Sequence, residues 1–179
     1  MEIKTERLLL REFKEDDWEA VFAYQNNPLY LRYYDWTERS EQNAQDFVAI
    51  FLTQQQAKPR YKFQLASTLA DSGRLIGNCG LRLTVPGSKI GDIGYELDPL
   101  FWGNGYATEA ARGMLQFGFE QLQLHRITAV CIAENEGSVR VLTKLGMQQE
   151  GRLRENEYFK GQWWDQLIFA ILEHEWNGS

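Results

Sequence analysis

The sequence predicts a mixed α/β fold, in which a mostly antiparallel sheet of about seven strands is flanked by about four helices. Short segments of alternating apolar residues, such as 61–65, are separated by turn residues such as Asp71-Ser72-Gly73, which is typical of antiparallel strands. Apolar residues also recur at helical spacing over 107–122. A chain of 179 residues with 44% hydrophobic residues can bury about two-thirds of its unfolded surface, so we expect a single domain over residues 1–179.

The N-terminal part of the chain is expected to hold one strand and two helices. Residues 5–13, with three consecutive leucines, are predicted to form a largely buried strand. A helix begins near residue 14 and ends before Asn26-Asn27-Pro28, which is a stop signal. A second helix begins at Ser40, where Asn43 takes the place of the Glu or Gln of a capping box. Between the helices we expect a loop over 29–36 that is rich in aromatic residues.

An antiparallel meander follows and leads into a strand–helix–strand unit. Its strands are predicted at 61–65, 74–85 and 89–97. The strand at 125–132 follows the long helix, so it is expected to run parallel to the strand at 89–97. Asn135 is a good N-cap for the next helix, and Gly146 fits a left-handed C-terminal cap. A hairpin of 150–159 and 163–172 completes the chain.

A turn that contains two glycines joins the strand at 89–97 to the long helix. Its sequence is Trp102-Gly103-Asn104-Gly105-Tyr106-Ala107-Thr108-Glu109-Ala110. Glycines let backbone N–H groups point outward, and a helix start adds unpaired N–H groups and the positive end of the helix dipole. These features suit a phosphate or pyrophosphate, although the glycines could also serve only to form a tight turn. The turn lacks the G-K-[ST] ending of a nucleotide P-loop and the third glycine of a dinucleotide site.

Composition argues against several classes of function. The net charge of −6 does not favour a nucleic-acid-binding surface, although an acidic surface suits basic partners. Cys79 and Cys131 lie in apolar runs and form no C-x-x-C pair, so we expect neither a disulfide nor a bound metal. No apolar stretch approaches the ~20 residues of a membrane span. The charged N-terminus lacks a signal-peptide core, and a cytoplasmic protein without membrane partners is expected.

Several of these residues resemble a known family. Gly94-Tyr95, Asp98-Pro99 and the segment 102–110 are similar to the acetyl-CoA-binding segment of the GNAT acetyltransferase superfamily. They are most similar to its RimJ/RimL branch, which acetylates N-terminal amines of ribosomal proteins. Trp102 stands where most of the superfamily has Gln or Arg, a departure that this branch shares. The resemblance implies a GNAT-like fold with one splayed parallel pair of strands.

The resemblance also implies a set of cofactor-binding residues. The backbone from Gly103 to Thr108 would bind the pyrophosphate of coenzyme A, and a free N–H near Tyr95 would polarise the thioester carbonyl. Asn135 would contact the cofactor arm, a role compatible with that of an N-cap. The complete expected set is Tyr95, Leu97, Trp102, Gly103, Asn104, Gly105, Tyr106, Ala107, Thr108, Asn135 and Ser138.

Three residues are candidates for catalysis. Ser138 matches a branch serine at the leaving sulfur, where its hydroxyl would stabilise the thiolate, although it could instead bond only to backbone. Glu157 matches a branch glutamate that holds or deprotonates the acceptor amine, although a solvated acidic strand has the same appearance. Glu96 is a second candidate base, and the sequence leaves open which face of the sheet it occupies. Neither histidine is expected to act.

The aromatic segment supplies candidate substrate contacts, because in the resembling family this region lines the acceptor groove. Tyr33, Tyr34 and Trp36 could hold the apolar part of an acceptor, or could only pack the helix pair onto the sheet.

The predicted function is therefore an acetyl-CoA-dependent N-acetyltransferase that acts by direct transfer to a primary amine, with no metal. We expect the acceptor to be the N-terminal α-amine of a protein such as a ribosomal protein. The alternatives are an acetyltransferase for a polyamine, amino acid or amine antibiotic, and a non-catalytic acyl-CoA-binding module. Either a monomer or a homodimer fits the sequence.

Overall fold

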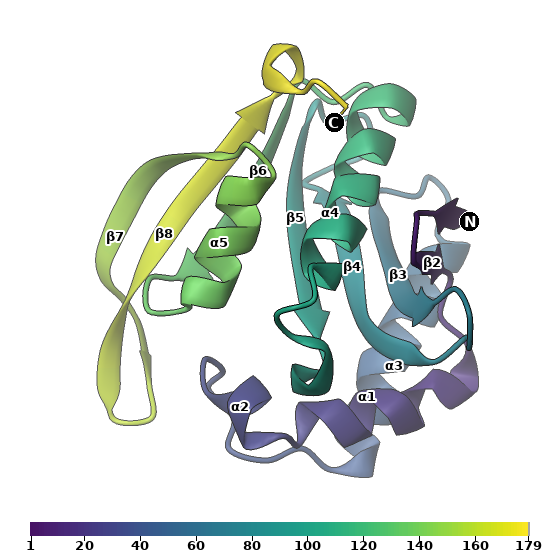
Figure 1. Ribbon diagram of the computed structural model, residues 1–179, viewed down its shortest axis with the longest axis vertical. Coiled ribbons are helices and arrows are strands. Elements are labelled where there is room, and N and C mark those ends of the chain that lie inside the picture. The colour runs from purple at the N-terminus through teal and green to yellow at the C-terminus, as the bar shows by residue number, and fades with distance from the viewer. Residues whose placement is uncertain (179) are drawn as a thin grey trace.

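The computed structural model describes residues 1–178, which form an eight-stranded sheet with helices on both faces (Figure 1). The strands are β1 (Glu2–Lys4), β2 (Leu8–Arg11), β3 (Lys62–Leu69), β4 (Leu75–Leu83), β5 (Ile90–Leu97), β6 (Arg126–Ile132), β7 (Gln148–Phe159) and β8 (Gln162–Leu172). The helices are α1 (Trp18–Gln25), α2 (Pro28–Leu31), α3 (Glu41–Gln56), α4 (Tyr106–Gln116) and α5 (Glu136–Lys144). The strand order is β1-β2-β3-β4-β5-β6-β8-β7, and only β5 and β6 are parallel.

The predicted mixed fold and its one parallel pair are confirmed, but the element counts are corrected. The sheet has eight strands rather than about seven, because the three-residue β1 pairs with β2 at one edge. The described residues form five α-helices rather than about four, because the expected loop over 29–36 begins with α2. This short helix starts where the Asn27 side chain accepts a hydrogen bond from the N–H of Leu29 and where Pro28 occupies the first position.

Local signals in the sequence correspond to observed caps. Ser40 and Asn43 form a reciprocal capping box at the start of α3. Asn135 accepts a hydrogen bond from the N–H of Ser138 at the start of α5. Gly146 has a φ of +79°, and the N–H groups of Gly146 and Met147 bond carbonyls of the last turn of α5. These caps fix where each helix meets the sheet.

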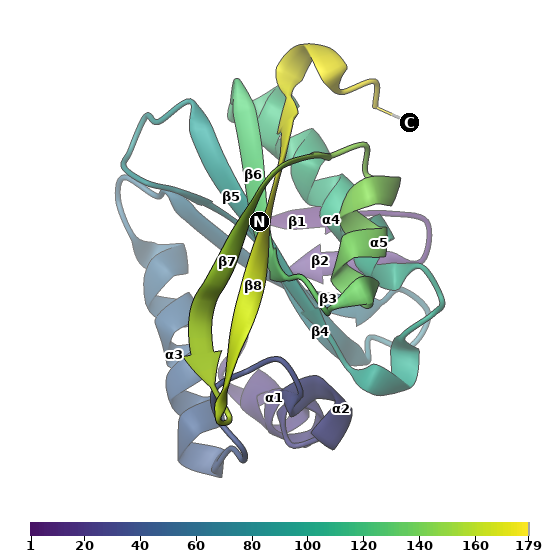
Figure 2. The same cartoon turned by 90° about the vertical axis from the view of Figure 1, so that its left-hand side faces the viewer.

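Helices cover the sheet from both sides and divide the core in two. Figure 2 places α3 on the left of the sheet and α4 and α5 on the right. The larger core lies between the sheet and α4 and α5, and its fully buried members include Leu65, Leu81, Met114, Leu115 and Ile127. A smaller core, around Val21, Tyr24 and Val48, lies between the sheet and α1 to α3. The two faces of the sheet are therefore separate environments.

The terminal hairpin of β7 and β8 joins the sheet through β6 and reaches the α2 segment at its tip. The side-chain amine of Lys160, in the turn of the hairpin, donates to the carbonyl of Leu31 at 2.6 Å. This contact links segments 129 residues apart. The hairpin tip and the aromatic segment consequently lie side by side, as Figure 1 also shows.

Gly77 of β4 is predicted to tolerate no side chain, because a Cβ there would lie 2.2 Å from the backbone oxygen of Glu96. We expect Gly77→Ala to lower the free energy of unfolding by about 1–3 kcal/mol, as overpacking does. Urea unfolding would measure this change. Gly151→Ala is the matched control, since the nearest atom would be 3.8 Å away. Equal midpoints for the two variants would contradict the prediction.

Candidate active site

The segment between β5 and α4 forms a loop that contains two glycines and leads into the helix. Gly103 and Gly105 have φ values of +79° and +84°, a region that favours glycine, and Gly105 is the N-cap of α4. The first helical bond runs from the N–H of Glu109 to the carbonyl of Gly105. Among residues 1–178, the N–H groups from Gly103 to Thr108 find no protein acceptor. Six free donors at a helix start fit an anion such as the diphosphate of coenzyme A.

The side chain of Trp102 connects the loop to the end of β5. Its indole N–H donates to the carbonyl of Leu97 at 2.8 Å, although 45% of the residue surface is exposed. The Asp98 side chain accepts from the N–H of Leu100 at 3.0 Å and starts the turn after β5. Trp102 therefore ties the loop to the end of the strand, and its ring nitrogen is already occupied.

The parallel pair of β5 and β6 extends over three residues only. Ile90, Gly91 and Asp92 pair with residues 126 to 128, and beyond this point the two strands separate. On the other side of β5, the N–H of Asp98 donates to the carbonyl of Ile76. Because ladder bonds alternate along an antiparallel strand, the N–H groups of Tyr95 and Leu97 point away from β4 toward the gap. The gap therefore offers backbone donors, among them the N–H of Tyr95.

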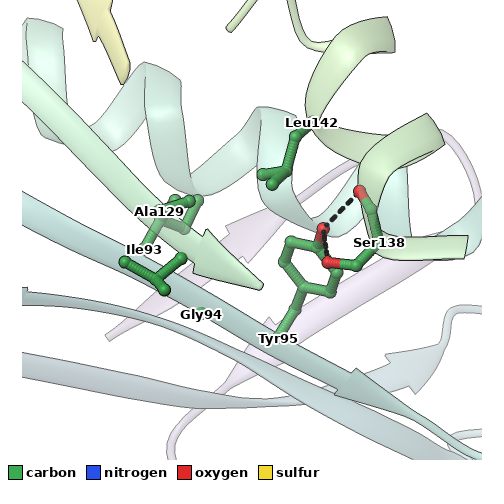
Figure 3. Close-up of a pocket in the computed structure, with 7 residues that line it drawn as sticks. Ile93, Gly94, Tyr95, Ala129, Ser138 and Leu142 are labelled. Carbon is green, nitrogen blue, oxygen red and sulfur yellow. Dashed lines mark hydrogen bonds between the residues drawn. The ribbon is translucent and has the colours of Figure 1, made fainter. Parts of the chain in front are cut away.

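A small pocket of about 80 Å³ lies in this gap (Figure 3). It is lined by Ile93, Gly94, Tyr95, Ala129, Val130, Ser138 and Leu142. The Tyr95 hydroxyl lies 2.9 Å from the Ser138 hydroxyl oxygen and donates to the Ser138 carbonyl at 3.2 Å. Burial raises the pKa of Tyr95, so its hydroxyl stays protonated. The structure thus brings Tyr95, Ser138 and Asn135 together at the start of α5.

Cys131 lies beside this pair of hydroxyls but is poorly suited to covalent catalysis. Burial raises the pKa of its thiol, and the hydrogen bond with Ser138 opposes that shift. A protonated, buried thiol is a weak nucleophile. The geometry therefore gives Cys131 none of the features of an activated nucleophile.

Glu96 projects from β5 to the opposite face of the sheet, toward α1 and α2. Its carboxylate accepts hydrogen bonds from the hydroxyl of Tyr24 at 3.2 Å, the amide of Gln25 at 3.4 Å, the hydroxyl of Tyr30 and the amide of Asn78. All four donors are neutral. Burial raises the pKa of Glu96, and these hydrogen bonds oppose the shift. A carboxylate enclosed in this way can accept a proton or hold an ammonium group.

Two of the three predicted aromatic contacts join the Glu96 side of the sheet. The ring of Tyr34 stacks between those of Tyr30 and Trp36, with centroid distances of 4.7 and 4.6 Å. The guanidinium of Arg39 lies over the Trp36 ring at 4.8 Å. Both Tyr34 and Trp36 are half-buried, so the stack both packs α1 to α3 and borders the Glu96 group.

Tyr33 points elsewhere, toward the terminal hairpin and the start of α5. Its hydroxyl donates to the carbonyl of Glu134 at 2.7 Å, and its ring meets the edge of Trp164 at 5.8 Å. Tyr33 therefore connects the aromatic segment with the residue that precedes Asn135.

Glu157 is exposed on β7 and lies apart from Ser138. It is opposite Trp164 in the hairpin, and its carboxylate accepts from the Gln166 amide at 3.0 Å. Leu167 and Phe169 of β8 pack in the core on the α4 and α5 side, so Trp164, and Glu157 opposite it, face the other side of the sheet. Glu157 therefore lies at the exposed rim of the Glu96 side and does not line the pocket.

Sequence reasoning missed the donors that surround Glu96. Tyr24, Gln25 and Asn78 come from α1 and β4, at separations of 18 to 72 residues from Glu96. One signal was available for Asn78 alone, since the expected antiparallel pairing of the meander places it opposite Glu96.

Among the described residues, no group of three His, Cys, Asp or Glu side chains could hold a metal ion. None of the helices in residues 1–178 has the length and apolar character that crossing a membrane requires.

Comparison with known proteins identifies the family. The family model described as "Acetyltransferase (GNAT) domain" matches residues 7–148. A curated relative from Bacillus subtilis, "Uncharacterized N-acetyltransferase YnaD", is 37% identical over 177 residues, which cover 99% of this chain and 100% of the relative. The crystal structure of a GNAT-family acetyltransferase from Bacillus anthracis has a TM-score of 0.86 and 34% identity, covering 97% of this chain and 99% of that one.

Two further solved structures, each 20% identical, share the fold alone. The first is RimL, a ribosomal L7/L12 α-N-protein acetyltransferase in complex with coenzyme A, with a TM-score of 0.84 and coverage of 96% of this chain and 98% of that one. The second is spermidine N-acetyltransferase from Vibrio cholerae with CoA and spermine, with a TM-score of 0.79 and coverage of 94% and 97%. From the family match and the full-length relative, this chain belongs to the GNAT family and is an acetyl-CoA-dependent acetyltransferase.

Proposed function

We propose that this enzyme, as one domain, transfers an acetyl group directly from acetyl-CoA to a primary amine, and that the amine is the N-terminal α-amine of a protein such as a ribosomal protein. The observation that carries the proposal is the arrangement of two neighbouring residues of β5. Tyr95 faces the pocket and α5 on one side of the sheet, whereas Glu96 faces α1 and α2 on the other. Cofactor and acceptor can therefore approach from opposite sides and meet at the gap.

On the cofactor side, we propose that the N–H groups of 103–108 hold the diphosphate and that Asn135 contacts the arm. Acetyl-CoA supplies an activated acetyl thioester. The N–H of Tyr95, which points into the gap, is placed to stabilise negative charge on the carbonyl oxygen. The Ser138 hydroxyl is placed to donate a hydrogen bond to the departing thiolate, and Tyr95 holds that hydroxyl in position.

On the acceptor side, an α-amine with a pKa near 8 must lose a proton before it attacks. Glu96 is our candidate for accepting that proton, because it is enclosed by neutral donors and has a raised pKa. Glu157, at the rim, would hold the incoming ammonium by charge. Tyr33, Tyr34 and Trp36 would contact the residues that follow the terminal amine.

Two features favour a protein terminus as acceptor. The Glu157 rim is exposed and open to a long substrate, and the net charge of −6 suits the basic N-terminal segments of many ribosomal proteins. The enclosed carboxylate and aromatic stack also fit a small polyamine, since cations bind well beside aromatic rings. A small-molecule amine is therefore the second candidate.

The test is thiol release from acetyl-CoA with a panel of acceptors. The panel contains peptides with free Ser, Ala and Met termini, the same peptides with blocked termini, polyamines, amino acids and aminoglycosides. We expect turnover with free-terminus peptides and none with blocked ones. Turnover confined to polyamines or other small amines would replace the peptide proposal with the second candidate.

Removal of the Ser138 hydroxyl should slow the transfer without loss of cofactor binding. A hydrogen bond to a charged group contributes about 1.5–3 kcal/mol, so we expect Ser138→Ala to lower kcat about 10- to 100-fold. Calorimetry should give a Kd for coenzyme A within about threefold of the unaltered enzyme. Thr143→Val removes a hydroxyl from the same helix outside the pocket and serves as the control. An unchanged kcat in Ser138→Ala would refute the assignment.

The two carboxylates should differ in their pH behaviour. Only the ionised form of Glu96 accepts a proton, so kcat should fall as the pH decreases through its pKa, which burial places above the ordinary value. We expect Glu96→Gln to lower kcat about 10²- to 10⁴-fold and to remove this acidic limb. Glu157→Gln should mainly raise KM for the acceptor. Glu155→Gln, which alters an exposed carboxylate on the same strand, is the control. If Glu157→Gln, rather than Glu96→Gln, removed the decrease of kcat at acidic pH, Glu157 would be the proton acceptor and Glu96 the residue that holds the ammonium.

A further inference from the structure

The N-terminal segment before β2 is attached to the first turn of α4 through one carboxylate. Glu109 accepts hydrogen bonds from the Thr5 hydroxyl at 2.6 Å, the Arg7 N–H at 2.7 Å and the Arg7 guanidinium Nε at 2.7 Å. Burial alone would raise the pKa of Glu109, but the hydrogen bonds from Thr5 and Arg7 outweigh it and hold the pKa below its ordinary value. Glu109 is therefore a fixed negative charge at the helix start.

The Arg7 guanidinium also reaches the loop that precedes α4. Its Nη1 donates to the Asn104 carbonyl at 3.0 Å, and its central carbon lies 4.4 Å from the centre of the Tyr106 ring. Its Nη2 lies 3.5 Å from the place that a Cβ on Gly105 would occupy. With 42% of its side chain exposed, Arg7 is a cation beside the proposed diphosphate loop.

The pairing of Arg7 with Glu109 reduces the repulsion between Glu109 and an anion bound at the helix start. A carboxylate in the first turn favours the helix dipole, but it repels a second anion at the same helix start. Three residues of helix span only about 4.5 Å, so Glu109 is close to any diphosphate bound by 103–108. The paired Arg7 cancels that repulsion while leaving the free N–H groups unobstructed.

Arg7 also orients the loop backbone. In a trans peptide the carbonyl and the following N–H point in opposite directions. Because Arg7 holds the carbonyl of Asn104, the N–H of Gly105 points away from Arg7. The contact therefore leaves the Gly105 N–H free to bind an anion. It also keeps the Asn104 carbonyl, which would repel an anion, turned toward Arg7.

We propose that Arg7 is a positioning residue for the cofactor diphosphate, which acts by neutralising Glu109 and by fixing the Asn104–Gly105 peptide. This inference rests on the proposed cofactor role of 103–108. It predicts that Arg7 matters for the diphosphate and not for the pantetheine arm, which occupies the gap between β5 and β6.

The test compares coenzyme A with pantetheine, which lacks the diphosphate. Calorimetry would measure the Kd of coenzyme A, and an NMR titration would measure that of pantetheine. We expect Arg7→Ala to raise the Kd of coenzyme A at least tenfold and to change that of pantetheine less than twofold. Adding Glu109→Gln to Arg7→Ala should recover at least threefold of the lost affinity, since the uncompensated charge is removed. Arg7→Lys, which keeps the charge, should lose less than Arg7→Ala.

Arg60→Ala is the matched control, because it breaks another ion pair of the N-terminal region, that with Glu12. It should leave both Kd values unchanged, and thermal unfolding would confirm that all variants are folded. Equal loss of affinity for both ligands in Arg7→Ala, no loss for coenzyme A, or no recovery in the double variant would each overturn the inference. Failure of the unaltered enzyme to bind coenzyme A would instead overturn the cofactor assignment of 103–108 and this inference with it.

Discussion

The separation of β5 from β6 is the constraint on which the rest of the site depends. Three paired residues hold the two strands together, and beyond Asp92 the chain leaves a gap in the middle of an otherwise continuous sheet. Backbone groups at a sheet interior normally bond each other, and unpaired ones are costly when buried. Here the opening is lined by Tyr95 and Ser138, whose hydroxyls bond each other. The gap therefore leaves free the backbone N–H groups of β5 that would be hydrogen-bonded in a complete sheet.

Glu96, on the same strand, is kept at a cost in stability. Its folded-state pKa is raised, so the folded protein binds that proton more tightly than the unfolded chain does. The contribution to stability is full below the unfolded pKa and is lost as pH rises through the folded pKa. At neutral pH the fold thus retains a desolvated carboxylate that four neutral donors only partly stabilise. An apolar side chain would pack at this position without that cost. The presence of a carboxylate therefore supports a functional role for Glu96.

Local chemistry explains which features the sequence could predict. The glycine turn, the Asn135 N-cap and the Ser40 capping box depend on residues within three or four positions of one another. The surroundings of Glu96 depend instead on Tyr24 and Asn78, which come from other elements. Tyr33 and Tyr34 are adjacent in sequence yet point to different surfaces, and no periodicity distinguishes them because their segment combines a short helix with a turn. The strand β1 was missed because three residues carry too little alternation to be recognised.

The two sides of the sheet also differ in charge. On the α4 side, free N–H groups and the helix dipole favour anions, and Arg7 removes the local effect of Glu109. On the α1 side, the carboxylates of Glu96 and Glu157 suit the cationic amine that we propose as acceptor. The guanidinium of Arg39 also lies on this side, where it donates to the Gln25 amide oxygen and covers the Trp36 ring. Because Tyr95 and Glu96 are consecutive residues of β5, one faces the pocket and the other faces α1, and our proposal places the acetyl transfer at this point of the strand.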